Sequence, residues 1–110
     1  MITKKDLIKI NQQFASGRIS NTSSLDFALK QIQCSPHWYK NMCLLTRNVV
    51  IDQIFEDGNK RTAVAVIITY LELNNCEYNP DKISQLVIKI IKSKITNLET
   101  IGRLIHHGTK

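Results

Sequence analysis

Apolar side chains recur along most of this chain every three or four residues, which is the spacing that places them on one face of an α-helix. Polar and charged residues fill the positions between them. Five amphipathic segments show this spacing: Leu7–Phe14, Leu25–Ile32, Trp38–Val49, Ile83–Ile91 and Leu98–Ile105. The pattern therefore predicts an all-α fold.

A sixth segment, Ala63–Leu73, is apolar on nearly every side. Its β-branched residues would also suit a strand, but the run is too long for one and shows no alternation. A helix without a polar face is usually buried at the centre of its domain. We therefore expect a single compact bundle of about six helices around this buried central helix, in one domain that covers residues 1–110.

Residues that commonly begin helices precede most of these segments. Gly17 is expected to close the first helix, with Phe14 on its inward face. The predicted starts are a capping box from Thr3 to Asp6, a cap at Ser23 or Ser24, Ser35-Pro36, Asn79-Pro80, and a second capping box from Thr96 to Glu99.

A polar and charged stretch, Asp52–Thr62, lies directly before the predicted central helix. Gly58 can take a positive φ without steric cost, and Asn59 is among the few other residues that tolerate one. A bend there can direct successive backbone N–H groups at one anion, together with the positive end of a helix that opens at Asn59 or Lys60. Lys60 and Arg61 would add two positive charges.

Two carboxylates, Glu56 and Asp57, complete this stretch. Magnesium prefers oxygen ligands and is often shared with the phosphates of a substrate, so we expect Asp57, and secondarily Glu56, to hold the metal. The spacing alone favours this phosphate and metal site no more than the alternative, a helix–loop–helix turn with a solvated cluster of charges.

The segment Phe55-x-Asp57-Gly58-Asn59-Lys60-Arg61-Thr62-Ala63 resembles the signature of the Fic/Doc family, most closely its Doc (death-on-curing) branch. The resemblance implies a small all-helical protein that binds ATP, or another nucleoside triphosphate, with Mg²⁺. It also implies transfer of a phosphoryl group, or a nucleotidyl group (AMPylation), to a hydroxyl of a protein target. Doc toxins are neutralised by an antitoxin, so the resemblance predicts the toxin of a toxin–antitoxin pair.

The chain departs from the family signature at the position of the catalytic residue. The family has a histidine two residues before the phenylalanine, where it acts as general base, and this chain has Gln53. A glutamine amide cannot take the proton. Val64 stands where nucleotidyl-transferring members usually carry a second arginine, which favours the Doc-like branch. The resemblance therefore implies an impaired kinase or adenylyltransferase, or alternatively a non-catalytic module that binds a nucleotide or an antitoxin.

Composition and charge add few constraints. Apolar residues at 43% and charged residues at 22% are ordinary for a globular protein. The net charge of +6 is spread over many lysines, so an acidic antitoxin segment is a better expected partner than nucleic acid, which remains a third hypothesis. The absence of a long apolar stretch or signal block predicts a cytoplasmic protein without membrane contact. Cys34, His37 and Cys43 lack the fourth ligand of a structural zinc site.

Overall fold

Six α-helices make up the computed structural model, which describes residues 2–109. The helices are α1 Lys4–Gln12, α2 Thr22–Gln33, α3 Trp38–Ile51, α4 Asn59–Leu73, α5 Pro80–Ser93 and α6 Leu98–Gly108. Within this part of the chain, extended pairing is limited to two isolated bridges, Ile19 with Phe55 and Tyr78 with Thr109. The predicted all-α bundle is confirmed.

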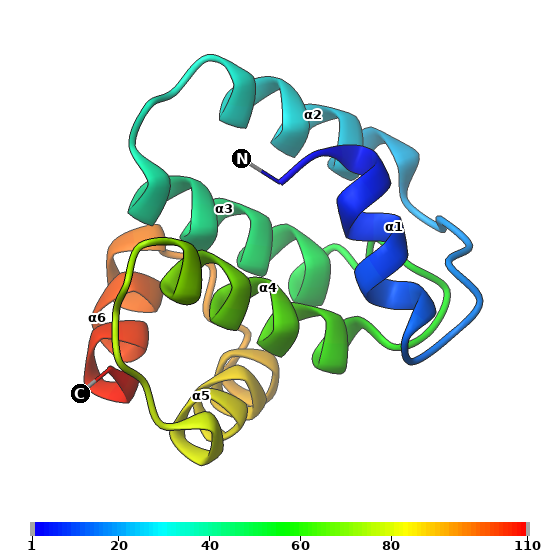
Figure 1. Cartoon of the computed structure of the whole chain (residues 1–110). Helices are drawn as coiled ribbons and strands as arrows, with labels where there is room; N and C mark the ends of the chain where they lie inside the picture. The colour runs from blue at the N-terminus through cyan, green and yellow to red at the C-terminus, as the bar shows by residue number, and fades with distance from the viewer. Residues whose placement is uncertain (1, 110) are drawn as a thin grey trace.

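Helices α3 and α4 lie side by side at the centre of the bundle and run in opposite directions (Figure 1). The other helices pack around this pair: α1 and α5 on α4, and α2 and α6 on α3. Residues 63–71 of the predicted run are buried or half-buried, which confirms the buried central helix, whereas the last residue of the run, Leu73, is 64% exposed. The last turn of α3 and the first turn of α4 lie next to α1 (Figure 1). Residues 52–58, the polar loop, join them.

The buried apolar side chains of all six helices form one continuous core. Phe55, in the loop before α4, is 1% exposed and belongs to this core, as does its neighbour Ile54. Burying a side chain of this size contributes roughly 1.5–3 kcal/mol. The side chains of Ile54 and Phe55 therefore anchor the polar loop in the core.

Several helix ends agree with the prediction. Thr3 and Asp6 form the expected capping box at the start of α1. Asn79 caps α5, with Pro80 as its first residue. The first helix is shorter than predicted: α1 ends at Gln12, before Gly17. Phe14 therefore lies beyond the helix and is 37% exposed instead of facing the core.

The other three predicted starts were wrong by one to three residues. Asn21 and Asn97 cap α2 and α6, each through a side-chain oxygen that accepts a backbone N–H three residues ahead. These asparagines take the place of the predicted serines and Thr96. Helix α3 begins only after His37, because the Ser35 hydroxyl accepts the His37 N–H in a separate turn. In the part of the chain that the structure describes, no helix is long and apolar enough to cross a membrane.

Candidate functional site

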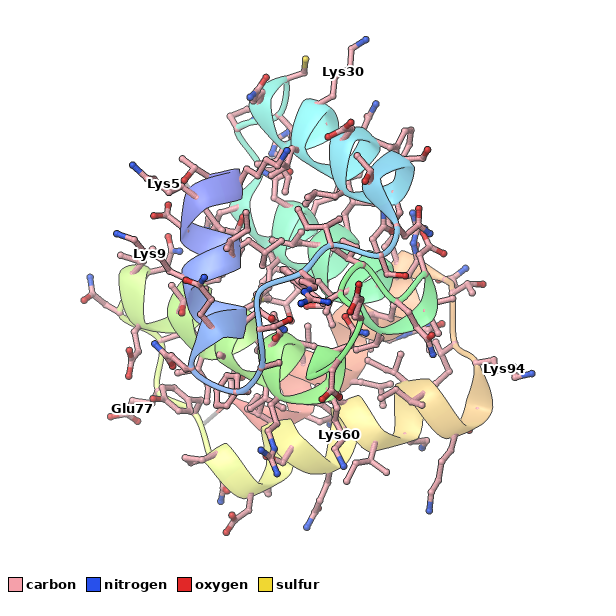
Figure 2. All side chains as sticks on the ribbon, turned by 90° about the vertical axis from the view of Figure 1, so that its right-hand side faces the viewer. Lys5, Lys9, Lys30, Lys60, Glu77 and Lys94 are labelled. Atoms are coloured by element: carbon pink, nitrogen blue, oxygen red, sulfur yellow. The ribbon has the colours of Figure 1, made fainter. Side chains whose placement is uncertain are left out.

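The loop from Asp52 to Gly58 connects the two central helices and is paired with the connection between α1 and α2. The Glu56 N–H donates to the carbonyl of Arg18 at 3.0 Å, and the Ser20 N–H donates to the carbonyl of Ile54 at 2.7 Å. Figure 2 shows the α1–α2 connection passing in front of the start of α4. The polar loop is thus held on its outer side by backbone hydrogen bonds and on its inner side by the core.

Gly58 sets the point at which α4 begins. Its φ of +76° is left-handed, as the sequence predicts, and α4 starts at the next residue, Asn59. A Cβ at Gly58 would lie 3.1 Å from the Cβ of Ala15 and 3.2 Å from Nδ2 of Asn11. A larger residue would therefore be both strained and crowded against the end of the first helix.

Asn59 acts differently from the expectation. It is helical and does not share the positive φ of Gly58. Its side chain folds back on the loop: Oδ1 accepts the Phe55 N–H at 2.9 Å, and Nδ2 donates to the Phe55 carbonyl at 2.8 Å. Asn59 therefore fixes the shape of the loop with its side chain. Only its backbone N–H, at the N-terminus of α4, remains available for an anion.

Asn11 is a site residue that the sequence analysis missed. This side chain on α1 is completely buried. Its Nδ2 donates to the Asp57 carbonyl at 2.9 Å and to the Thr62 hydroxyl at 3.0 Å, while its Oδ1 accepts the Gly17 N–H at 2.9 Å. One amide thus joins α1, the polar loop and α4.

A polar pocket of about 480 Å³ opens at this point. It is lined by Phe14, Gln53, Glu56, Asp57, Gly58, Asn59, Lys60 and Arg61. All seven residues that the sequence predicts for the site are therefore brought together around one cavity. Phe14 joins them because the first helix ends early and leaves its ring at the surface.

The side of the pocket that α4 forms carries positive charge. The first backbone N–H groups of α4 lack intrahelical acceptors, as in any α-helix, and no side chain caps this helix. Lys60 and Arg61 are exposed, and within residues 2–109 neither has a carboxylate oxygen within 4.0 Å. Both charges, together with the positive end of the helix dipole, are free to meet an anion. Figure 2 labels Lys60 at the start of α4, on the side of α5.

The two carboxylates differ in their neighbours. Glu56 lies 3.9 Å from Arg18 in an exposed ion pair. Asp57 accepts the Gly58 N–H through Oδ1 at 2.8 Å and keeps its other oxygen free of protein hydrogen bonds in the described chain. In residues 2–109 there is no group of three or more metal-binding side chains. The carboxylates that line the pocket therefore number two, Glu56 and Asp57.

Gln53 lines the pocket just beyond the end of α3. Its φ of +51° is the left-handed conformation that often terminates a helix. Asp52, the only adjacent carboxylate in the chain, faces elsewhere: its Oδ2 accepts the Ser24 hydroxyl at 2.7 Å, and its carbonyl accepts from Asn21. The described pocket thus offers no titratable base at the position of the family histidine.

A second, apolar groove of about 380 Å³ adjoins the pocket between α4 and α5. It shares Phe14, Lys60 and Arg61 with the polar pocket. Beyond these three, it is lined by Val64, Ala65, Ile68, Ser84 and Ile88. The site therefore combines a charged end with an apolar extension along the central helix.

In comparisons with known proteins, no family model and no curated protein matched the chain. The Fic/Doc resemblance of the loop thus stays a prediction, and the geometry of the site carries the functional interpretation.

Proposed function

We propose that this chain is a Fic/Doc-like protein that binds a nucleoside triphosphate, with ATP as the expected ligand, together with Mg²⁺. The observation that carries the proposal is the pocket at the uncapped N-terminus of α4, where Gly58, Lys60 and Arg61 adjoin two carboxylates. Phosphate groups bind helix N-termini through free N–H groups and the helix dipole. Among small anions, a polyphosphate with Mg²⁺ uses both the cations and the carboxylates.

Each residue of the pocket has a defined part in this proposal. The N–H groups of Asn59 and Lys60 donate to phosphate oxygens, and Arg61 adds a planar pair of donors. Asp57, with Glu56 as a second ligand, holds Mg²⁺, which when bound neutralises charge on the phosphates. The adjoining apolar groove between α4 and α5 offers room for the nucleoside part of the ligand. Asn11 and Asn59 keep the loop in place.

Transfer to a protein hydroxyl would be slow in this chain. The hydroxyl oxygen attacks phosphorus, and the bond to the leaving group, a nucleoside diphosphate or pyrophosphate, breaks. The hydroxyl must also release its proton, and the Gln53 amide has no basic atom to receive it. Phosphoryl transfer otherwise depends mainly on positioning and on electrostatic stabilisation, which the pocket can supply. The proposal is therefore a Doc-like toxin with an antitoxin partner, whose transfer of a phosphoryl or nucleotidyl group is impaired at Gln53.

A calorimetric titration with ATP, with and without Mg²⁺, tests the binding step. The unsubstituted chain is expected to bind ATP more tightly with Mg²⁺ present. Arg61→Ala should weaken binding about 10- to 100-fold, since a hydrogen bond to a charged group contributes about 1.5–3 kcal/mol. Lys60→Ala should also weaken it, whereas Lys92→Ala, the same change at an exposed site on α5, should not. Equal binding by all four proteins would reject the site.

The alternative is a non-catalytic module that binds a nucleotide or an antitoxin and transfers nothing. The observation that favours it is the lack of a base: Gln53 is not titratable, and Asp52 is bound to Ser24. Gln53→His separates the two functions, because a restored base is worth roughly 10²–10⁴-fold in rate. Labelled phosphate or nucleotide on a protein target, or growth arrest of a bacterial host expressing the variant, would support the impaired enzyme. No transfer by a variant that still binds ATP would support the module.

A further inference from the structure

Another cavity lies far from the polar loop. It is a groove of about 730 Å³ between the first half of α3 and the length of α6. In Figure 1, α6 and the start of α3 are at the opposite end of the bundle from the loop before α4. The groove shares no residue with the nucleotide pocket, so its occupant is independent of the proposed nucleotide.

The floor of this groove is apolar and closely packed. Gly102, in the middle of α6, lets the two helices approach: a Cβ there would lie 3.3 Å from Cε2 of Tyr39 and 3.5 Å from Sγ of Cys43. The Tyr39 hydroxyl donates to the Gly102 carbonyl at 2.6 Å, which fixes the ring across the groove. Burial raises the pKa of Tyr39 to about 12 and that of Cys43 to about 11. The floor therefore stays uncharged at neutral pH.

The rim of the groove is mainly basic. Lys40 on α3 and Arg103 on α6 are exposed on its two sides. Among the described residues, no carboxylate lies within salt-bridge distance of either. Three exposed histidines and one carboxylate complete the polar lining: His37, His106, His107 and Glu99. The groove thus combines an apolar floor with one cation on each side.

We propose that this groove binds an acidic amphipathic helix of a protein partner. Its apolar side chains would lie on Tyr39, Cys43 and Gly102, and its Asp or Glu side chains would face Lys40 and Arg103. The groove follows α6 from Leu98 to His107, which is about 13 Å at the rise of an α-helix, or roughly two and a half turns. This length matches the stripe of apolar anchors that a helix places in a groove.

Charge and shape favour this occupant over nucleic acid. Binding to a phosphate backbone depends on neutralising several phosphates with lysine and arginine. Here only two permanent cations border the groove, and Glu99 stands among them. An apolar centre with a charged rim is instead the common arrangement of a protein–protein interface.

The test uses a fluorescent helical peptide of about 14 residues, with leucines at the spacing of one helix face and glutamates on the flanks. Anisotropy gives its affinity, and amide shifts of the ¹⁵N-labelled protein give its location. A peptide with lysines in place of the glutamates, dodecanoate and a DNA duplex serve as alternative probes. We expect the acidic peptide to shift amides of α3 and α6 and to bind at least about tenfold more tightly than the lysine peptide.

Charge reversal in the protein provides the matched test. Lys40→Glu and Arg103→Glu should each weaken the acidic peptide several-fold and improve the lysine peptide. Lys92→Glu, the same change at an exposed site of α5 that does not line the groove, should alter neither. The proposal is overturned by equal binding of both peptides, by shifts outside α3 and α6, or by shifts there with dodecanoate or DNA but not with the acidic peptide.

Discussion

Replacing Asn11 with alanine should loosen the polar loop and destabilise the whole domain. The side chain is completely buried and makes three hydrogen bonds, to the Asp57 carbonyl, the Thr62 hydroxyl and the Gly17 N–H. Each such bond contributes about 0.5–1.5 kcal/mol net, and alanine would also leave its partners unsatisfied. We therefore expect Asn11→Ala to lower the free energy of unfolding by about 2–4 kcal/mol, a large part of the roughly 5–15 kcal/mol of an ordinary domain.

Urea unfolding followed by circular dichroism measures this loss, and two variants calibrate it. Thr62→Val removes one of the three partners and should cost about 1 kcal/mol. Asn97→Ala removes an exposed asparagine that caps α6 through the Thr100 N–H, and should also cost about 1 kcal/mol. A loss for Asn11→Ala no larger than that for Asn97→Ala would refute the inference that this residue joins three elements.

The same variants separate stability from binding. Asn11 fixes the carbonyl of Asp57, next to Gly58, whereas Asn97 lies in the connection to α6. Under conditions where both variants remain folded, Asn11→Ala should weaken Mg-ATP binding and Asn97→Ala should leave it unchanged. Equal affinity in the two variants would show that the loop keeps its shape without Asn11.

Gly58→Ala should lower the free energy of unfolding by about 1–2 kcal/mol, because alanine is disfavoured at a left-handed φ, and it should weaken ATP binding. Urea denaturation measures the first effect and calorimetry the second, and an unchanged affinity would contradict the role of the bend. Since the pKa of Tyr39 is raised from 10.0 to about 12, the unfolded state loses this proton first, so stability should fall as the pH rises through that range, and less steeply in Tyr39→Phe. A disulfide reagent should label the exposed Cys34 at once and the buried Cys43 only on unfolding. Equal labelling rates of the two thiols would contradict the burial of Cys43.

Much of the fold was predictable because local pattern and tertiary packing agree. The apolar run from Ala63 to Leu73 has no polar face, and a helix of that kind must be buried on most sides. The predicted site residues, from Gln53 to Arg61, are close together in the sequence, so a single bend at Gly58 brings them to one pocket. Where the chemistry is contiguous, local backbone preferences are enough.

The parts that were missed depend on residues distant in sequence or on competition between neighbours. Asn11 contacts Asp57, which is 46 positions away, and nothing near Asn11 indicates this partner. A signal existed, however: Asn11 stands four residues after Leu7, on the inward face of the first helix, where a polar residue must find buried partners. The cap of α2 was missed because Asn21 competes with two nearby serines, and only the bonds of Asn21 to Ser24 and to the Asp52 carbonyl decide it.

The groove between α3 and α6 also has no local signature. In the sequence, Gly102 only indicates a position that weakens a helix, yet in the fold it allows contact with Tyr39 and Cys43, 63 and 59 residues earlier. Such a cavity emerges only when two amphipathic helices pack against each other.

The most direct test of the proposed nucleotide site is a titration of the ¹⁵N-labelled protein with Mg-ATP, followed through its backbone amides. The site predicts that the largest shifts occur at Gly58, Asn59, Lys60 and Arg61. The N–H groups of Asn59 and Lys60 would donate to the phosphates, and Gly58 and Arg61 adjoin them, with the Gly58 N–H held by Asp57. Shifts that are absent at saturating Mg-ATP, or that spread over the lysines of α1 and α5 without a maximum at the start of α4, would contradict it.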